Sequence, residues 1–188
     1  MLRQLANIPN ILTLLRIISI LPIVLLIQHN LYILAFVLTL LAQTTDFFDG
    51  KIARKTNSVT SLGAVLDPFA DKIFIISLLS IFTTKGLLNP YYFCISLTRD
   101  ILQLLAIPIL IGYKKIMFKV QPKLLPKLAT VLKYIIIAIL FLATIINFNI
   151  QMTLMPVLII STIFEAYILY TFFMRFLKIY KGEHNTFE

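Results

Sequence analysis

Four aspartates are spaced so that their carboxylates could bind metal ions and act on a phosphate. They occur as Asp46 and Asp49, then Asp67 and Asp71, in a chain with only eight acidic residues. On a helix, residues three or four positions apart share a face, so each pair would present two carboxylates together. Carboxylate ligands favour hard cations such as Mg²⁺ or Mn²⁺ over zinc. Two such ions would neutralise the carboxylates, clamp a diphosphate and activate a hydroxyl, and one aspartate could serve as the base.

Small residues and one arginine follow the first aspartate pair. Gly50 and Ala53 extend its helix face almost without side chains, and Arg54 adds a guanidinium suited to phosphate. Gly63 leaves room in the same way before the second pair. A lone pair of small residues is more often a helix-packing position than a ligand site. The whole set favours a binding site, because uncompensated carboxylates in apolar surroundings carry a large desolvation cost.

The rest of the chain has the composition of an integral membrane protein. Of its 188 residues, 60% are hydrophobic, a share well above that of soluble domains. Six apolar segments are separated by polar or proline-bearing breaks, at 11–27, 31–45 running on into the aspartate motif, 68–84, 90–113, 126–146 and 153–176. We therefore expect an all-α integral membrane protein, a six-transmembrane-helix bundle that forms a single domain over residues 1–188.

Basic residues are distributed unevenly between the two ends of these segments. The breaks 28–30, 85–89 and 147–151 hold one of the seventeen Lys and Arg, namely Lys85. The positive-inside rule then places both termini and the links 46–67 and 113–127 in the cytosol. The net charge of +9 could also attract nucleic acid, but basic residues beside apolar segments more often set topology and bind anionic lipid headgroups. We expect membrane lipids, and no nucleic acid, as partners.

The third apolar segment fixes where the second aspartate pair lies. Only 13 residues separate Asp71 from Lys85, too few to cross a membrane, so we expect the helix to begin near Asp67, with Pro68 in its first turn. At about 1.5 Å per residue from the outer ends, Asp46 and Asp71 lie roughly 20 Å deep. Asp49 and Asp67 lie roughly 26 Å deep by the same rise. The four carboxylates would thus lie at two matched levels near the cytosolic edge of the membrane.

Further ionisable residues interrupt the apolar segments, namely Arg16, Arg99, Asp100, Lys133 and Glu165. Each costs about 3 kcal/mol at the bilayer centre unless it is paired or hydrated. They can be interpreted as the lining of a polar cavity open to the cytosol. The alternative is an internal ion pair, between Arg99 and either Asp100 or Glu165. An anionic acceptor would need cations beside the metal ions, and the candidates are Arg99, Lys123 and Lys127.

The complete motif resembles a known family signature. The string D-x2-D-G-x2-A-R-x8-G-x3-D-x3-D over residues 46–71 is similar, at every defining position, to that of the CDP-alcohol phosphatidyltransferases. The opening from Asn7 to Arg16 and the string from Leu66 to Lys72 resemble bacterial phosphatidylglycerophosphate synthases and the related cardiolipin synthases. The resemblance implies transfer of the phosphatidyl group of CDP-diacylglycerol to an alcohol, with release of CMP and two divalent cations, Mg²⁺ or Mn²⁺, as cofactors. It also implies a homodimer in the bacterial cytoplasmic membrane.

The resemblance assigns roles to individual positions as well. The two metal ions would be bound by Asp46, Asp49, Asp67 and Asp71, and Asp71 would also accept a proton from the attacking hydroxyl. The positions that hold cytidine and diphosphate in the family correspond here to Gly50, Ala53, Arg54, Thr60 and Gly63.

The acceptor alcohol is specified less closely. Many phosphatidylglycerophosphate synthases have Arg-Glu where this chain has Arg99-Asp100, and a second lysine where it has Ala129. Both departures favour the cardiolipin-synthase branch, in which phosphatidylglycerol is the acceptor, whereas the opening motif fits either branch. We expect glycerol 3-phosphate as acceptor, with phosphatidylglycerol as the alternative. An ion-coupled transporter would need charges across the full depth of the membrane, and the outer breaks hold only Lys85.

Overall fold

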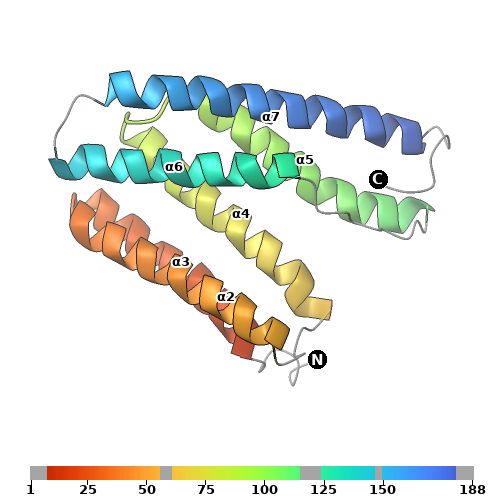
Figure 1. The fold of residues 1–188 in the computed structure, drawn as a ribbon, viewed down its shortest axis with the longest axis horizontal. Coiled ribbons are helices and arrows are strands. Elements are labelled where there is room, and N and C mark those ends of the chain that lie inside the picture. The colour runs from red at the N-terminus through yellow and green to blue at the C-terminus, as the bar shows by residue number, and fades with distance from the viewer. Residues whose placement is uncertain (1–7, 56–60, 115–123, 147–149, 181–188) are drawn as a thin grey trace. The chain divides into compact units, whose positions relative to one another are not determined.

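The structure, a computed structural model, describes residues 8–55, 61–114, 124–146 and 150–180. Within these ranges every regular element is a helix (Figure 1): α2 (Ile8–Gln28), α3 (Tyr32–Lys55), α4 (Ser61–Thr84), α5 (Pro90–Lys114), α6 (Leu124–Ile146) and α7 (Gln151–Tyr180). Each of the six apolar segments falls within one helix, apart from Leu31 just before α3, so the predicted all-α class is confirmed.

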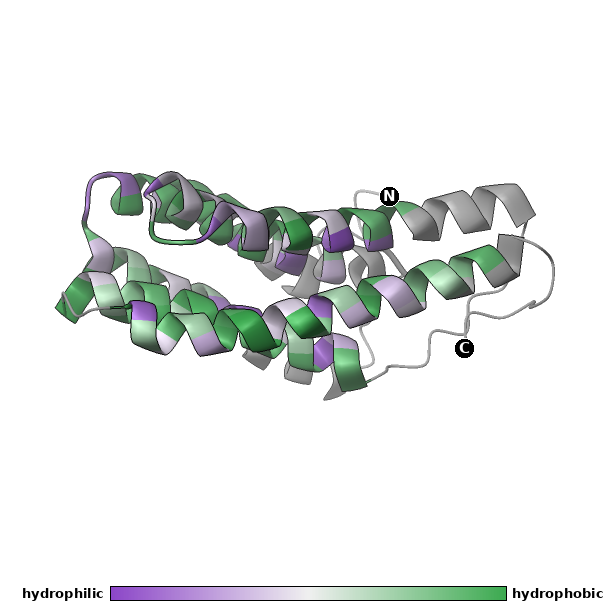
Figure 2. Cartoon of the chain, turned by 90° about the horizontal axis from the view of Figure 1, so that it is seen from above, coloured by the Kyte–Doolittle hydropathy of each residue, from purple (hydrophilic) through white to green (hydrophobic). Residues whose placement is uncertain are grey.

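Most residues along these helices are hydrophobic, with hydrophilic residues isolated between them or gathered at connecting turns (Figure 2). Among the described residues, Leu124–Ile146 of α6 and Gln151–Met174 of α7 are long and apolar enough to cross a membrane. The apolar stretches Thr13–Gln28 of α2 and Tyr32–Thr45 of α3 are shorter. Large apolar side chains are exposed both on the longer apolar helices and on the shorter apolar stretches, for example Ile163 on α7 and Leu21 on α2. Such exposure is expected of surfaces that face lipid.

The helices form two compact units. The first comprises Met1–Leu87 with Leu140–Phe148, and the second comprises Leu88–Ile139 with Asn149–Glu188. Helices α2, α3 and α4 therefore belong to the first unit, and α5 and α7 belong to the second. Helix α6 contributes to both, because the division falls between Ile139 and Leu140.

In the first unit, α2 packs against both α3 and α4. An aromatic cluster lies in its core: the ring of Phe141 meets that of Phe82 edge-on at a centroid distance of 5.0 Å and that of Phe36 at 5.4 Å. Phe82 and Phe141 are fully buried. Since Phe141 belongs to α6, this cluster attaches the end of α6 to α3 and α4.

The turn between α2 and α3 is held by Lys85, the residue that directly follows α4. Asn30 has a positive φ of 61°, a conformation that asparagine adopts more readily than most residues. Lys85 Nζ donates to the carbonyl of Gln28 at 3.0 Å and to Asn30 Oδ1 at 2.8 Å. Lys85 therefore lies at the C-terminal end of α2, where the helix dipole favours a cation.

In the second unit, α5 packs against α7. The hydroxyls of Tyr92 and Ser161 lie 2.9 Å apart and share a buried hydrogen bond. Cys94, two residues before the buried Ser96 on α5, is free and exposed. The buried face of α5 is thus polar at several positions, which explains why α5 is less apolar than α6.

One helix boundary differs from the sequence-based expectation. The prediction that the third helix begins near Asp67 with Pro68 in its first turn was wrong, because α4 begins at Ser61 and Pro68 lies inside it. Residues 61–66 hold no proline and continue the helical run, and tertiary packing can stabilise a helix that contains a proline. Asp67 is consequently an interior residue of α4 rather than its N-cap.

Candidate active site

The family-like signature lies on two helices of the first unit. Helix α3 carries Asp46, Asp49, Gly50, Ala53 and Arg54 near its C-terminal end. Helix α4 carries Gly63, Asp67 and Asp71, and Thr60 lies outside the described residues. Because both stretches are helical, the spacing puts each aspartate pair on one helix face. Helix α2 packs against both helices, so it is the common neighbour of the two elements that carry the signature.

Of the four signature aspartates, Asp71 is the one whose side chain the structure describes. Arg16 Nη1, from α2, donates to Asp71 Oδ1 in a hydrogen-bonded ion pair. The Arg16 side chain is 2% exposed, whereas that of Asp71 is 36% exposed. For Asp46, Asp49 and Asp67 the structure describes the backbone, and the mutual approach of the four carboxylates stays a prediction.

The donor set at these four positions fits divalent cations. It consists of carboxylates alone, which suits Mg²⁺ or Mn²⁺. The Asp71 carboxylate also contacts a positive group, Arg16, with which a metal ion bound there would share it. No cluster of three or more metal-ligand side chains occurs among those that the structure describes, a set that excludes the other three aspartates.

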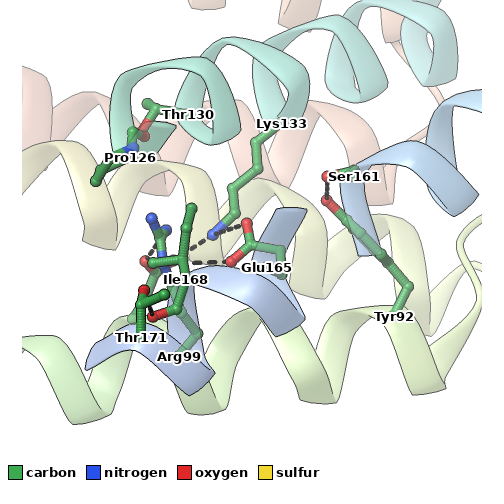
Figure 3. A network of polar contacts seen from close by, with 10 residues as sticks. Tyr92, Arg99, Pro126, Thr130, Lys133, Ser161, Glu165, Ile168 and Thr171 are labelled. Atoms are coloured by element: carbon green, nitrogen blue, oxygen red, sulfur yellow. Dashed lines mark hydrogen bonds and ion pairs between the residues drawn. The ribbon is translucent and has the colours of Figure 1, made fainter. Parts of the chain in front are cut away.

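A second group of charged residues lies in the second unit, where it forms a ring of alternating charges (Figure 3). Asp100 accepts from Arg99 Nη1 at 2.9 Å and from Lys133 Nζ at 2.6 Å. Glu165 pairs with Arg99 Nε at 3.3 Å and with Lys133 Nζ at 3.2 Å. All four side chains are at most 3% exposed. Helices α5, α6 and α7 each contribute to this ring, and its two positive and two negative groups cancel.

Arg99 therefore forms the internal ion pair that was the alternative interpretation of the sequence, and both Asp100 and Glu165 are its partners. Of the other candidates for acceptor binding, Lys127 is exposed near the start of α6, and Lys123 lies outside the described residues. The cavity lined by all five buried ionisable residues stays a prediction. Arg16 belongs to the first unit and the ring to the second.

Several contacts were missed from the sequence, and two of them show why. The pairing of Arg16 with Asp71 had a signal, because Arg16 interrupts an apolar helix and buried arginines need an acidic partner. That signal does not choose among eight acidic residues. The hydrogen bond between Tyr92 and Ser161 had no signal, since both residue types are common in apolar helices.

Comparison with known proteins defines the class of protein. Residues 6–167 match the sequence model of the CDP-alcohol phosphatidyltransferases, and the chain belongs to this family. A CDP-diacylglycerol–glycerol-3-phosphate 3-phosphatidyltransferase of Aquifex aeolicus is 40% identical over 126 residues, which cover 66% of this chain and 69% of that protein. The protein of the same name from Rickettsia bellii is 50% identical over 72 residues, or 37% of this chain and 40% of the relative.

A relative of another name is also similar. The CMP-forming cardiolipin synthase of Streptomyces coelicolor is 36% identical over 76 residues, which cover 40% of this chain and 35% of that protein. The chain thus matches less than half of the length of the Rickettsia and Streptomyces proteins.

Proposed function

We propose that this protein transfers the phosphatidyl group of CDP-diacylglycerol to glycerol 3-phosphate and releases CMP. One observation carries the proposal: the family match spans residues 6–167 and includes a signature without a missing position, distributed over α3 and α4. Relatives named for this reaction, from Aquifex and Rickettsia, support glycerol 3-phosphate as the acceptor over phosphatidylglycerol.

In this proposal, two divalent cations, Mg²⁺ or Mn²⁺, are held by Asp46, Asp49, Asp67 and Asp71. When bound, the ions would supply charge neutralisation for the diphosphate and for the departing CMP. Asp71 accepts the proton of the attacking hydroxyl. This role suits Asp71 because its side chain is the more exposed member of the ion pair with Arg16.

The remaining signature residues bind the donor. The guanidinium of Arg54 pairs with the diphosphate, for which its planar donors are suited. Gly50, Ala53 and Gly63 leave space for the nucleotide beside the backbone of α3 and α4, and Thr60, in the link between these helices, contributes a hydroxyl.

We further propose that all six helices span the bacterial cytoplasmic membrane, that the active site faces the cytosol, and that the protein is a homodimer. The distribution of basic residues supports the orientation. Lys123 and Lys127 are proposed to bind the acceptor phosphate. At Arg99 the acceptor would share the guanidinium with Asp100 and Glu165, whose carboxylates already contact it.

The test is an assay of purified protein with CDP-diacylglycerol, Mn²⁺ or Mg²⁺, and each acceptor in turn. We expect CMP release with glycerol 3-phosphate and none with phosphatidylglycerol. Asp71→Asn should abolish turnover while nucleotide binding persists, since three metal-binding aspartates remain. CMP release with phosphatidylglycerol alone would transfer the assignment to cardiolipin synthesis, and no CMP with either acceptor would exclude the proposed reaction.

A further inference from the structure

Arg16 is a buried cation placed against the proposed catalytic aspartate. It lies on α2, outside the signature at 46–71, and only 3% of the residue is exposed. A buried guanidinium is costly unless a carboxylate compensates it, and Asp71 supplies that carboxylate. The pair is asymmetric, because the Asp71 side chain is 36% exposed and that of Arg16 only 2%. Arg16 therefore approaches Asp71 from the interior of the unit.

The position of Arg16 favours one property of Asp71, the orientation of its carboxylate, and opposes another, the binding of a divalent cation. A guanidinium donates in fixed directions, so it restrains the orientation of the carboxylate that it contacts. It also raises the local positive potential, and in a buried site water and salt screen this potential weakly. A divalent cation that binds Asp71 must therefore share its carboxylate with a positive charge that repels the cation.

We propose that Arg16 is a positioning residue for Asp71. Its guanidinium holds the Asp71 carboxylate in place and competes with divalent cations for the negative charge of that carboxylate. The inference rests on the proposed function, because it takes Asp71 as both metal ligand and proton acceptor. Arg16 would thus weaken metal binding while it supports turnover. If Arg16 served only the stability of the fold, its removal would instead weaken both metal binding and turnover.

The experiment removes the charge and measures metal binding separately from activity. Full-length Arg16→Met in detergent micelles is titrated with Mn²⁺ in the absence of CDP-diacylglycerol, and free Mn²⁺ is measured by electron paramagnetic resonance. We expect Mn²⁺ to bind about three- to tenfold more tightly than to the wild type. We expect kcat to fall by about tenfold or more, because the Asp71 carboxylate loses its orientation.

Three variants keep the test interpretable. Arg16→Lys retains the charge without the planar fork, so Mn²⁺ affinity should stay near the wild type and kcat should recover in part. Arg16→Gln replaces Arg16→Met if the methionine variant does not fold, and its Mn²⁺ affinity should also rise. Lys85→Met is the matched control: it removes one positive charge from the same unit, roughly 20 Å away along α4, and should leave Mn²⁺ binding unchanged.

A double variant tests whether Arg16 acts through Asp71. In an Asp71→Asn background, the charge that Arg16 compensates is absent, so Arg16→Met should alter Mn²⁺ affinity much less than it does in the wild type. Equal effects in both backgrounds would overturn the positioning role. Mn²⁺ affinity that falls or stays constant in Arg16→Met would overturn it as well. A wild-type protein that binds no Mn²⁺ would instead contradict the metal site of the proposed function.

Discussion

Asp100 and Glu165 each contact both Arg99 and Lys133, so every charge in the buried ring has two partners of opposite sign. Taking such groups out of water costs several kcal/mol per ion, and the contacts offset that cost only while the ring is complete. Removal of one member leaves an uncompensated buried charge, which is far worse than removal of a neutral pair.

We therefore predict that Glu165→Gln lowers the free energy of unfolding by about 3–5 kcal/mol. The measurement is denaturant unfolding in micelles, followed by circular dichroism. The matched control is Ser96→Ala on α5, since the buried Ser96 hydroxyl has no hydrogen-bond partner among the described residues; it should change stability by less than about 0.5 kcal/mol.

The double variant Lys133→Met with Glu165→Met removes one positive and one negative group and leaves the pair of Arg99 and Asp100. We expect its loss of unfolding free energy to be smaller, by about 1–3 kcal/mol, than the sum of the losses in the two single variants. Additive effects would show that Lys133 and Glu165 do not compensate one another.

At the scale of residues, the sequence identified the buried charges but not all of their partners. The pairing of Arg99 with Asp100 or Glu165 was one of two open alternatives, because depth along a helix can be counted while rotation of the helix cannot. The pairing of Arg16 with Asp71 was not anticipated for the same reason. Which acidic residue pairs with which basic residue depends on the rotation of each helix about its axis. The spacing of residues within a helix does not determine that rotation.

At the scale of elements, a single aromatic residue attaches the end of α6 to the first unit. Phe141 is fully buried and its ring contacts those of Phe36 and Phe82. We predict that Phe141→Ala lowers the free energy of unfolding by about 3–5 kcal/mol, from lost burial and the cavity that remains. The neighbouring Leu142, 42% exposed, provides the control: Leu142→Ala should cost less than about 1 kcal/mol. Equal costs for the two variants would contradict the packing role.

The turn between α2 and α3 depends on one left-handed residue. Asn30 has a φ of 61°, and its side chain accepts a hydrogen bond from Lys85. We predict that Asn30→Val costs about 1–2 kcal/mol of unfolding free energy in backbone strain alone. Asn30→Gly also removes the acceptor for Lys85 but relieves the strain, so it should be the less damaging change. Thermal melts of the two variants under identical conditions provide the measurement, and Asn30→Gly should have the higher Tm. A higher Tm for Asn30→Val would show that backbone strain at this position is unimportant.

The six helices of the described residues, with their approximate bounds, followed from the apolar segments and the breaks between them. The start of α4 did not, because proline was taken as a helix-starting signal although it lies inside α4. Local signals of this kind yield to tertiary packing, which a single sequence does not reveal.

At the scale of the whole molecule, the asymmetry of basic residues predicts how the chain crosses the membrane. Met152, at the start of α7, is 85% exposed, and Leu124, at the start of α6, is 75% exposed. In a Cys94→Ser background, we predict that Met152→Cys reacts with a membrane-impermeant maleimide in spheroplasts. Leu124→Cys should react only after permeabilisation. The reverse pattern would invert the proposed topology and place the aspartates outside the cell.

The buried ring also has a consequence for the order in which the protein is made. In the six-span arrangement, Arg99 and Asp100 enter the membrane together on α5, whereas Lys133 arrives on α6 and Glu165 only on α7. If all six helices span the membrane as proposed, the Lys133 ammonium would lack a second carboxylate partner from the synthesis of α6 until that of α7. In that arrangement, release of the helices from the insertion machinery would become favourable once α7 has been translated, because Glu165 then completes the charges of the ring.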